Sequence, residues 1–221
     1  MLALFREHGI KFLFMIPRLA VRKLLPTIHN GGLVKVTKNG FWSPRAPSGK
    51  SLRKAARLFN EIKGKVIIEI GSGIQGHFSG NSVLIWAKKT NAERIICLDL
   101  NPKEIKLVKD ATTKFPQVEA LVQDGIEYVD NFDGKIDLLY LDFWTDDPEG
   151  ELPGTGRAQA YLDAYKAARK KLSETSLILI DDTDHIHPWK HTEIIPAARK
   201  DGFRVLHVGR QTLMARSLEK K

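Results

Sequence analysis

Short apolar runs alternate with amphipathic stretches along the chain from about residue 51 onward. The runs are rich in Ile, Leu and Val and are short, which predicts strands buried on both faces. They are Val66–Ile70, Arg94–Leu98, Val118–Val122, Ile136–Asp142 and Ser176–Asp182. Helical spacing of apolar residues predicts helices over Ser51–Ile62, Ser82–Lys89, Lys103–Lys114 and Ala158–Lys171. The alternation indicates βαβ units, and therefore a parallel sheet with helices on both faces.

The end of the chain follows a different pattern. The apolar runs "FRVLHV" (203–208) and "QTLMA" (211–215) are separated only by Gly209 and Arg210. So short a connection permits a hairpin but no crossover, which makes the last strand antiparallel. We therefore predict an α/β fold, a doubly wound, Rossmann-like sheet of seven strands whose last strand is antiparallel.

Charge is spread unevenly along the 221 residues, whose formal net charge is +9. Residues 1–63 hold 13 Lys and Arg residues but only two acidic residues. We expect residues 1–50 to form a basic amphipathic accessory segment, with helices broken at Pro17 and Pro26, ahead of a main domain at 51–221. Such a segment suits packing on protein, including a second copy in a homodimer, or contact with an anionic membrane surface. Nucleic acid is the less favoured partner.

The N-terminal region has no apolar run long enough to span a membrane and no signal-peptide pattern. We expect a cytoplasmic protein, with peripheral attachment to a membrane as the alternative. The single cysteine, Cys97, lies in an apolar run, which predicts a buried core thiol rather than a disulfide or a nucleophile.

A glycine-rich turn follows the first apolar run. The stretch "EIGSGIQG" (69–76) has the spacing G-x-G-x-x-G, at which backbone N–H groups can approach a ligand without interference from a Cβ atom. Asp99, 23 residues after Gly76, can accept hydrogen bonds from both ribose hydroxyls, and Asp124 can meet the exocyclic amine of an adenine. Because parallel strands end at one edge, these groups predict a site for an adenosine-containing ligand there.

These residues resemble class I S-adenosylmethionine (SAM)-dependent methyltransferases, from about Val66 to Ala215. The resemblance is carried by "EIGSGIQG", by Asp99, by "QDGI" and by the antiparallel last strand, and it favours SAM over NAD. It implies that residues 51–221 form the methyltransferase domain. The cofactor-binding residues that it implies are Glu69, Gly71, Ser72, Gly73, Gly76, Asp99, Leu100, Asp124 and Gly125.

Carboxylates also end the fourth and fifth apolar runs, in "YLDFWTDD" and "LIDDTDH". These segments are similar to those of metal-dependent O-methyltransferases of the catechol type and of the macrolide sugar type. The resemblance implies a hydroxyl of a small molecule as the acceptor, and Mg²⁺ held by Asp142, Asp181 and Asp182. Carboxylates suit Mg²⁺, and a bound divalent ion lowers the pKa of a hydroxyl that it contacts.

The chain departs from both patterns at the catalytic base. The catechol-type lysine is replaced by Thr145, the sugar-type acid by Trp144, and the asparagine ligand by Thr183. The candidate catalytic residues are Asp142, Asp146, Asp184 and His185. Trp144 and Trp189 are either walls for a ring-shaped acceptor or ordinary packing residues. With His187 and His191, His185 predicts a loop facing the substrate rather than a zinc site.

Other functions fit the sequence less well. The stretch "APSGKS" (46–51) ends like a nucleotide-hydrolase loop, but Pro44 stands where that motif needs its first glycine. A short-chain NAD oxidoreductase would need a lysine where Arg169 stands. A nucleic-acid methyltransferase acting on base amines would commonly have two prolines in the segment "DFWT". A methyltransferase-like protein without catalytic activity stays open as a further alternative.

Overall fold

A computed structural model describes residues 28–29, 32–33, 35–37, 40–42, 48–73, 82–144, 155–184 and 189–216. The helices expected before Pro26 lie outside the described residues. The chain divides into two compact units, Met1–Ala46 and Pro47–Lys221. In the first unit, β1 (Ile28–His29) pairs antiparallel with β2 (Gly32–Leu33), and β3 (Lys35–Thr37) with β4 (Gly40–Trp42). The predicted division after residue 50 stays a prediction.

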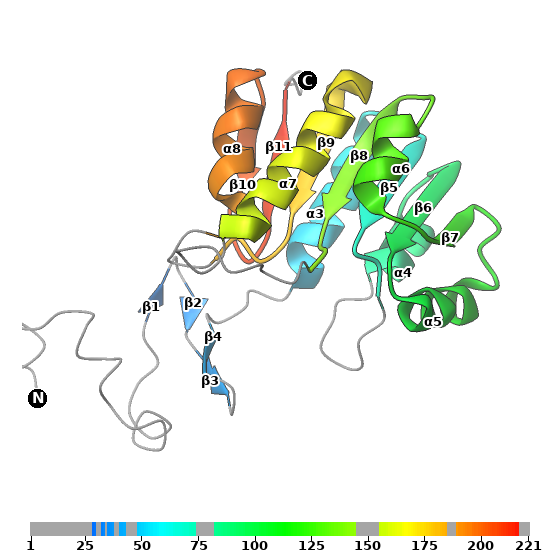
Figure 1. The fold of residues 1–221 in the computed structure, drawn as a ribbon, viewed down its shortest axis with the longest axis horizontal. Coiled ribbons are helices and arrows are strands. Elements are labelled where there is room, and N and C mark those ends of the chain that lie inside the picture. The colour runs from blue at the N-terminus through cyan, green and yellow to red at the C-terminus, as the bar shows by residue number, and fades with distance from the viewer. Residues whose placement is uncertain are drawn as a thin grey trace, which may run out of the picture. The chain divides into compact units, whose positions relative to one another are not determined.

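The second unit is built on a sheet of seven strands in the order β10-β11-β9-β8-β5-β6-β7 (Figure 1). Strands β5 to β9 are parallel, and β11 lies antiparallel between β9 and β10, which confirms the predicted fold class. The strands are β5 (Val66–Ile70), β6 (Arg94–Asp99), β7 (Val118–Val122), β8 (Ile136–Leu141), β9 (Leu172–Ile180), β10 (Arg204–His207) and β11 (Thr212–Ala215).

Helices cover both faces of this sheet. One core cluster joins its first face to α3 (Ser48–Glu61), α4 (Ser82–Lys89) and α5 (Pro102–Thr112). A second core cluster joins the opposite face to α6 (Gly125–Asn131), α7 (Thr155–Ala168) and α8 (His191–Lys200), which Figure 1 shows along one side of the sheet. Cys97 lies fully buried in the first cluster, as predicted. None of the helices in the described ranges is long and apolar enough to cross a membrane.

Two helices were not predicted. α6 is only seven residues long, and it begins where the carboxylate of Asp124 accepts hydrogen bonds from the backbone N–H groups of Ile126 and Glu127. α8 contains Pro196, a residue that usually ends helical patterns, and its buried residues are Ile194 and Ala198. Both helices pack on the sheet, α6 through Val129 and α8 through Ile194, which belong to the second core cluster.

The glycine turn after β5 is packed against the chain that leaves β8. Gly71 has φ +88°, a left-handed conformation that favours glycine, and its N–H donates to the carbonyl of Leu98 in β6. A Cβ at this position would lie 2.3 Å from the backbone N and Cα of Phe143. The first, second and fourth strands of the parallel sheet therefore meet at one point of its carboxyl edge.

The substitution Gly71→Ala tests this close approach. Gly202→Ala is the matched control, because Gly202 has a similar φ of +87° but a Cβ added there would have no neighbouring atom within 4 Å. We expect Gly202→Ala to cost about 1 kcal/mol of unfolding free energy, from backbone strain alone. Gly71→Ala should cost at least about 2 kcal/mol more, because the backbone of β8 must also move. Urea unfolding measures both values, and equal losses would contradict the proposed crowding.

Candidate active site at the carboxyl edge of the sheet

Glu69, the predicted carboxylate of the glycine motif, is fully buried and points to α4. Its two oxygens accept hydrogen bonds from the Ser82 hydroxyl at 2.6 Å and from the Trp86 indole N–H at 2.7 Å. Burial raises the pKa of Glu69 to about 7, and the hydrogen bonds from Ser82 and Trp86 oppose that rise. The side chain therefore ties the central strand to the helix that follows the glycine turn.

The glycine turn itself is described only in its first half. Ser72 is fully buried, and its backbone N–H shares the Leu98 carbonyl with that of Gly71. A Cβ at Gly73 would lie 2.8 Å from the carboxylate of Glu104, a flexible side chain in the first turn of α5. Gly76 lies outside the described residues. Gly71 and Gly73 thus both stand where another chain segment comes close.

Two further acidic residues, Asp99 and Glu104, lie at and after the end of β6. Asp99 is half-buried, and its carboxylate accepts a hydrogen bond from the backbone N–H of Asn101 at 2.7 Å. Burial raises the pKa of Asp99, and the nearby charge of Glu104 adds to the rise. Glu104 has a buried carboxylate oxygen without a hydrogen-bond partner among the described residues, and sequence analysis did not identify it. The apolar side chain of Leu100, the residue after Asp99, is 69% exposed.

Asp124 and Gly125 lie at the start of α6. One Asp124 oxygen accepts the two backbone N–H bonds that cap the helix, which is a structural role that the sequence analysis did not name. The adenine contact of Asp124 stays a prediction. Gly125 is buried, and a Cβ there would lie 2.3 Å from a methyl group of Ile70. Only glycine lets α6 begin this close to β5.

An acidic cluster of Asp142, Asp181 and Asp182 follows β8 and β9. The two strands are paired in register, Leu141 opposite Ile180, so the next residue of each falls at the same level. One oxygen from each of the three carboxylates lies within 4.8 Å of the others, as the sequence predicted for one site. Asp181 is 1% exposed, whereas the side chain of Asp142 is one-third exposed, at 33%. Partial burial and the charge of Asp181 raise the pKa of Asp142 well above its ordinary value.

Two cationic side chains that the sequence analysis missed, Arg210 and Lys190, neutralise part of the negative charge of this cluster. Arg210, in the turn between β10 and β11, contacts Asp181 at 3.2 Å and Asp182 at 3.1 Å. The Lys190 ammonium, on a side chain only 2% exposed, lies 3.4 Å from Asp182 and 3.9 Å from Asp142. Burial alone would lower the pKa of Arg210, but the carboxylates of Asp181 and Asp182 outweigh it and raise that pKa.

The donor chemistry of the acidic cluster suits a divalent cation, but its surroundings do not. Three hard carboxylates are a ligand set that Mg²⁺ accepts. Arg210 and Lys190, however, already contact oxygens of all three carboxylates. An added ion would lie close to two positive charges, so the residues present do not fit a divalent cation. The predicted Mg²⁺ site stays a prediction that only metal binding can test.

A chain of hydrogen bonds from Ser51 through Gln211 and Tyr140 reaches the acidic cluster at Asp142. The Ser51 hydroxyl donates to the Gln211 side-chain oxygen, and the Gln211 amide donates to the Tyr140 hydroxyl at 2.9 Å. The Tyr140 hydroxyl then donates to Asp142 at 3.0 Å. Burial raises the pKa of Tyr140 well above its ordinary value, so the hydroxyl keeps the proton that it donates. Tyr140 lies in β8 and Asp142 follows the end of that strand, and the hydrogen bond from the Tyr140 hydroxyl orients the Asp142 carboxylate.

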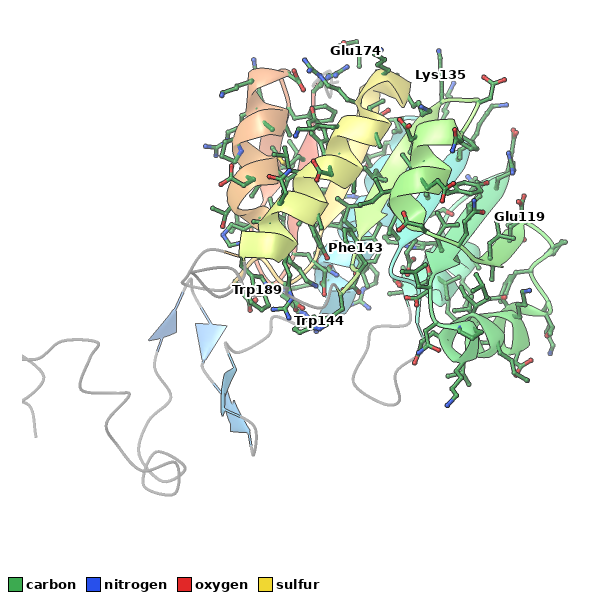
Figure 2. The ribbon with its side chains drawn as sticks, in the orientation of Figure 1. Glu119, Lys135, Phe143, Trp144, Glu174 and Trp189 are labelled. Atoms are coloured by element: carbon green, nitrogen blue, oxygen red, sulfur yellow. The ribbon has the colours of Figure 1, made fainter. Side chains whose placement is uncertain are left out.

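Aromatic side chains stand beside the acidic cluster, at the end of the sheet opposite Glu174 and Lys135 (Figure 2). Trp144 is 62% exposed, whereas Trp189 is buried, and their ring centroids are 5.9 Å apart. The Arg157 guanidinium lies 3.7 Å from the Trp144 centroid and 4.7 Å from that of Trp189. Of the two predicted walls, Trp144 is exposed and Trp189 is buried against it, and the role of either as a wall stays a prediction.

Thr183 and Asp184, the other predicted residues that the structure describes here, are not part of the acidic cluster. Thr183, where the catechol-type pattern has a ligand, turns to the β10–β11 hairpin and bonds the Thr212 hydroxyl and the Arg210 carbonyl. Asp184 is half-buried and is not among the three clustered carboxylates. The positions that lie outside the described residues are Thr145, Asp146, His185 and His187.

Comparison with known proteins agrees with this architecture. A family model described as a methyltransferase domain matches residues 69–183, slightly more than half of the chain. No curated protein matches the sequence.

Three solved structures illustrate the similarity of fold. The methyltransferase PaMTH1 of Podospora anserina, bound to S-adenosylhomocysteine (SAH), has a TM-score of 0.53 at 20% identity, over 77% of this chain and 78% of that one. The Bacillus cereus O-methyltransferase in complex with SAH has a TM-score of 0.52 at 13% identity, over 89% of this chain and 85% of that one. The N-methyltransferase NodS of Bradyrhizobium japonicum WM9 has a TM-score of 0.52 at 14% identity, over 76% and 93%. The shared fold does not select an acceptor atom.

The burial of Glu69 makes a prediction about stability and pH. Its pKa of about 7 in the folded protein exceeds the ordinary 4.5, so the folded state holds the proton more tightly and loses stability as pH rises between these values. Relative to Glu69→Gln, the wild-type protein should lose on the order of 3 kcal/mol between pH 4.5 and pH 8. Urea unfolding at both pH values gives this difference.

The exposed Glu93, paired with Lys65 on the surface, provides the control variant Glu93→Gln. For this control, the difference from wild type should stay nearly constant between the two pH values. If Glu69→Gln behaved like Glu93→Gln, Glu69 would not change its protonation across this range, contrary to the expectation.

Proposed function

Because the chain belongs to the methyltransferase-domain family, we propose that this SAM-dependent methyltransferase transfers the methyl group to a hydroxyl of a small molecule. One observation carries the proposal. The glycine turn after β5 lies against the backbone of Asp142 and Phe143, so the predicted cofactor turn and the acidic cluster share one edge of the sheet. A methyl donor and an acceptor must meet at such a point.

The first half of the site suits SAM. Gly71 and Gly73 let the Asp142–Phe143 backbone and Glu104 approach the turn closely, and Glu69 holds the strand below it; the backbone N–H groups of such a turn are where the methionine end of the ligand would bind. At the next strand, Asp99 can accept hydrogen bonds from the ribose hydroxyls, and the exposed Leu100 can cover the adenine. Glu104 has a carboxylate oxygen that lies beside Gly73 and has no hydrogen-bond partner among the described residues, and its negative charge favours a ligand with positive charge. SAM, when bound, supplies a methyl group on a positively charged sulfur.

The acidic cluster suits the removal of a proton from a hydroxyl. Asp142 is its most exposed member, and Tyr140 and Lys190 hold its carboxylate in place. A carboxylate whose pKa is raised is a stronger base than a free one. Asp142 takes the acceptor's proton as the acceptor oxygen forms its bond to the methyl carbon. The carbon–sulfur bond breaks, and its electron pair stays on sulfur, which leaves SAH.

The acceptor surface beside this base is aromatic. The Trp144 indole is exposed two residues after Asp142, and Arg157 stacks over the same ring. An exposed indole presents a flat apolar face, which matches a ring-bearing acceptor. Phe143 lies between Asp142 and Trp144 in the sequence, and its ring stacks on that of Tyr161 in α7 with the centroids 4.3 Å apart. The Tyr161 hydroxyl also donates to the Phe143 carbonyl at 3.0 Å. The segment that holds both base and surface is therefore anchored to α7.

Substitution of Asp99 tests the cofactor half of the site. Asp99→Asn keeps the shape but weakens hydrogen bonds from ribose hydroxyls, so SAH binding should fall by about 10- to 100-fold. Calorimetric titration with SAH measures the affinity. Asp110→Asn is the control, because Asp110 is an exposed acid on α5 paired with Lys106. Equal affinity of the two variants would contradict the assignment of Asp99.

Substitution of Asp142 tests the chemical half. Asp142→Asn should lower kcat at least about 100-fold, as expected for loss of a general base, while SAH affinity changes little. The assay follows transfer of a labelled methyl group from SAM to a panel of hydroxylated ring compounds. Asp163→Asn, an exposed acid on α7 paired with Lys166, should keep full activity. Full activity of Asp142→Asn would remove Asp142 from the proposed chemistry.

A further inference from the structure

Two cationic side chains of the protein, Lys190 and Arg210, neutralise much of the negative charge of the acidic cluster. Each of the carboxylates of Asp142, Asp181 and Asp182 contacts a cation at 3.1–3.9 Å. Arg210 bridges Asp181 and Asp182 through two different nitrogens, whereas Lys190 lies between Asp182 and Asp142. Two cations among three carboxylates leave one net negative charge. Three carboxylates this close would repel one another strongly without such partners.

The two cations are built into the fold. The Lys190 side chain is 2% exposed, and its ammonium also lies 5.4 Å from the Tyr161 ring centroid and 5.6 Å from that of Trp144. The Arg210 side chain is 13% exposed, and its backbone carbonyl accepts the Thr183 N–H at 2.7 Å. Neither group can leave without giving up several contacts. A buried ion pair is hard to break, because the partner left behind would be an uncompensated charge.

We infer that Lys190 and Arg210 supply the positive charge that Mg²⁺ was expected to supply at Asp142, Asp181 and Asp182, so that this site works without a divalent cation. The inference rests on the proposed function, since it concerns the cofactor requirement of that same site. The net charge left on the cluster accommodates one proton from an acceptor hydroxyl. The ammonium of Lys190, beside Asp142, stabilises the negative charge that develops on the acceptor oxygen.

Calorimetric titration of the full chain with MgCl₂, after chelation and desalting, tests this inference. Mg²⁺ is the probe because it prefers oxygen ligands and largely ignores the histidines of the chain. We expect no saturable binding to the wild-type protein at millimolar Mg²⁺. The double variant Lys190→Met with Arg210→Met removes both cations at similar side-chain length, and should bind Mg²⁺ at least about tenfold more tightly. Lys106→Met, which removes an exposed lysine, should match the wild-type protein.

Because loss of both cations also destabilises the fold, we use thermal unfolding as a second measurement of Mg²⁺ binding. Mg²⁺ should raise the Tm of the double variant, and of Lys190→Met alone, but not that of the wild-type protein. Saturable binding to the wild-type protein that Asp142→Asn abolishes would overturn the inference. So would equal Mg²⁺ affinities of the wild-type protein and the double variant. SAH titration of the same samples separates the two proposals, because lost SAH binding would refute the proposed function while the Mg²⁺ result still decides this inference.

Discussion

The close approach of the Gly71 turn to the backbone of Asp142 and Phe143 is the constraint on which the site depends. It requires a residue without a Cβ and with a left-handed conformation, at the one place where the central strand leaves the sheet. Because of this contact, the turn after β5 and the acidic segment after β8 are neighbours. Gly125 plays a similar part at the start of α6, where it lies against Ile70 of the same strand.

Buried carboxylates at this edge are compensated in two different ways. Glu69 has neutral partners, a hydroxyl and an indole N–H, so its burial raises its pKa to about 7. The cluster after β8 and β9 has charged partners, Lys190 and Arg210, which keep several carboxylates together in a small volume. The first arrangement holds strand and helix together. The second leaves one carboxylate, Asp142, exposed enough to meet an acceptor.

The sheet was predictable from the sequence because its central strands β5, β6 and β8 are mostly buried and read as continuous apolar runs. The strand β5 was predicted with its exact bounds, and the in-register ends of β8 and β9 explain why Asp142 and Asp181 meet. α6 was missed because seven residues carry too short a pattern, and α8 because Pro196 lies inside it, although its buried residues Ile194 and Ala198 are four positions apart.

Lys190 and Arg210 were missed for a related reason. Neither belongs to a motif. Lys190 reaches the cluster from the start of α8, eight residues after Asp182, and Arg210 from the β10–β11 turn, 28 residues after it. The separate roles of Trp144 and Trp189 also depend on exposure, which spacing along the chain does not report. The carboxylates could be predicted as a group because strand ends meet at one edge, but their counter-charges could not.

Calorimetric titration of the wild-type protein with SAH, with NAD titrated in parallel, tests the central claim most directly. The family match supports SAM as the cofactor, and the glycine turn and the acid at the end of β6 are the places where we expect it to bind. We expect saturable binding of SAH at one site per chain and no binding of NAD. Binding of NAD alone would contradict the assignment of the cofactor, and binding of neither would indicate a methyltransferase fold without catalytic activity.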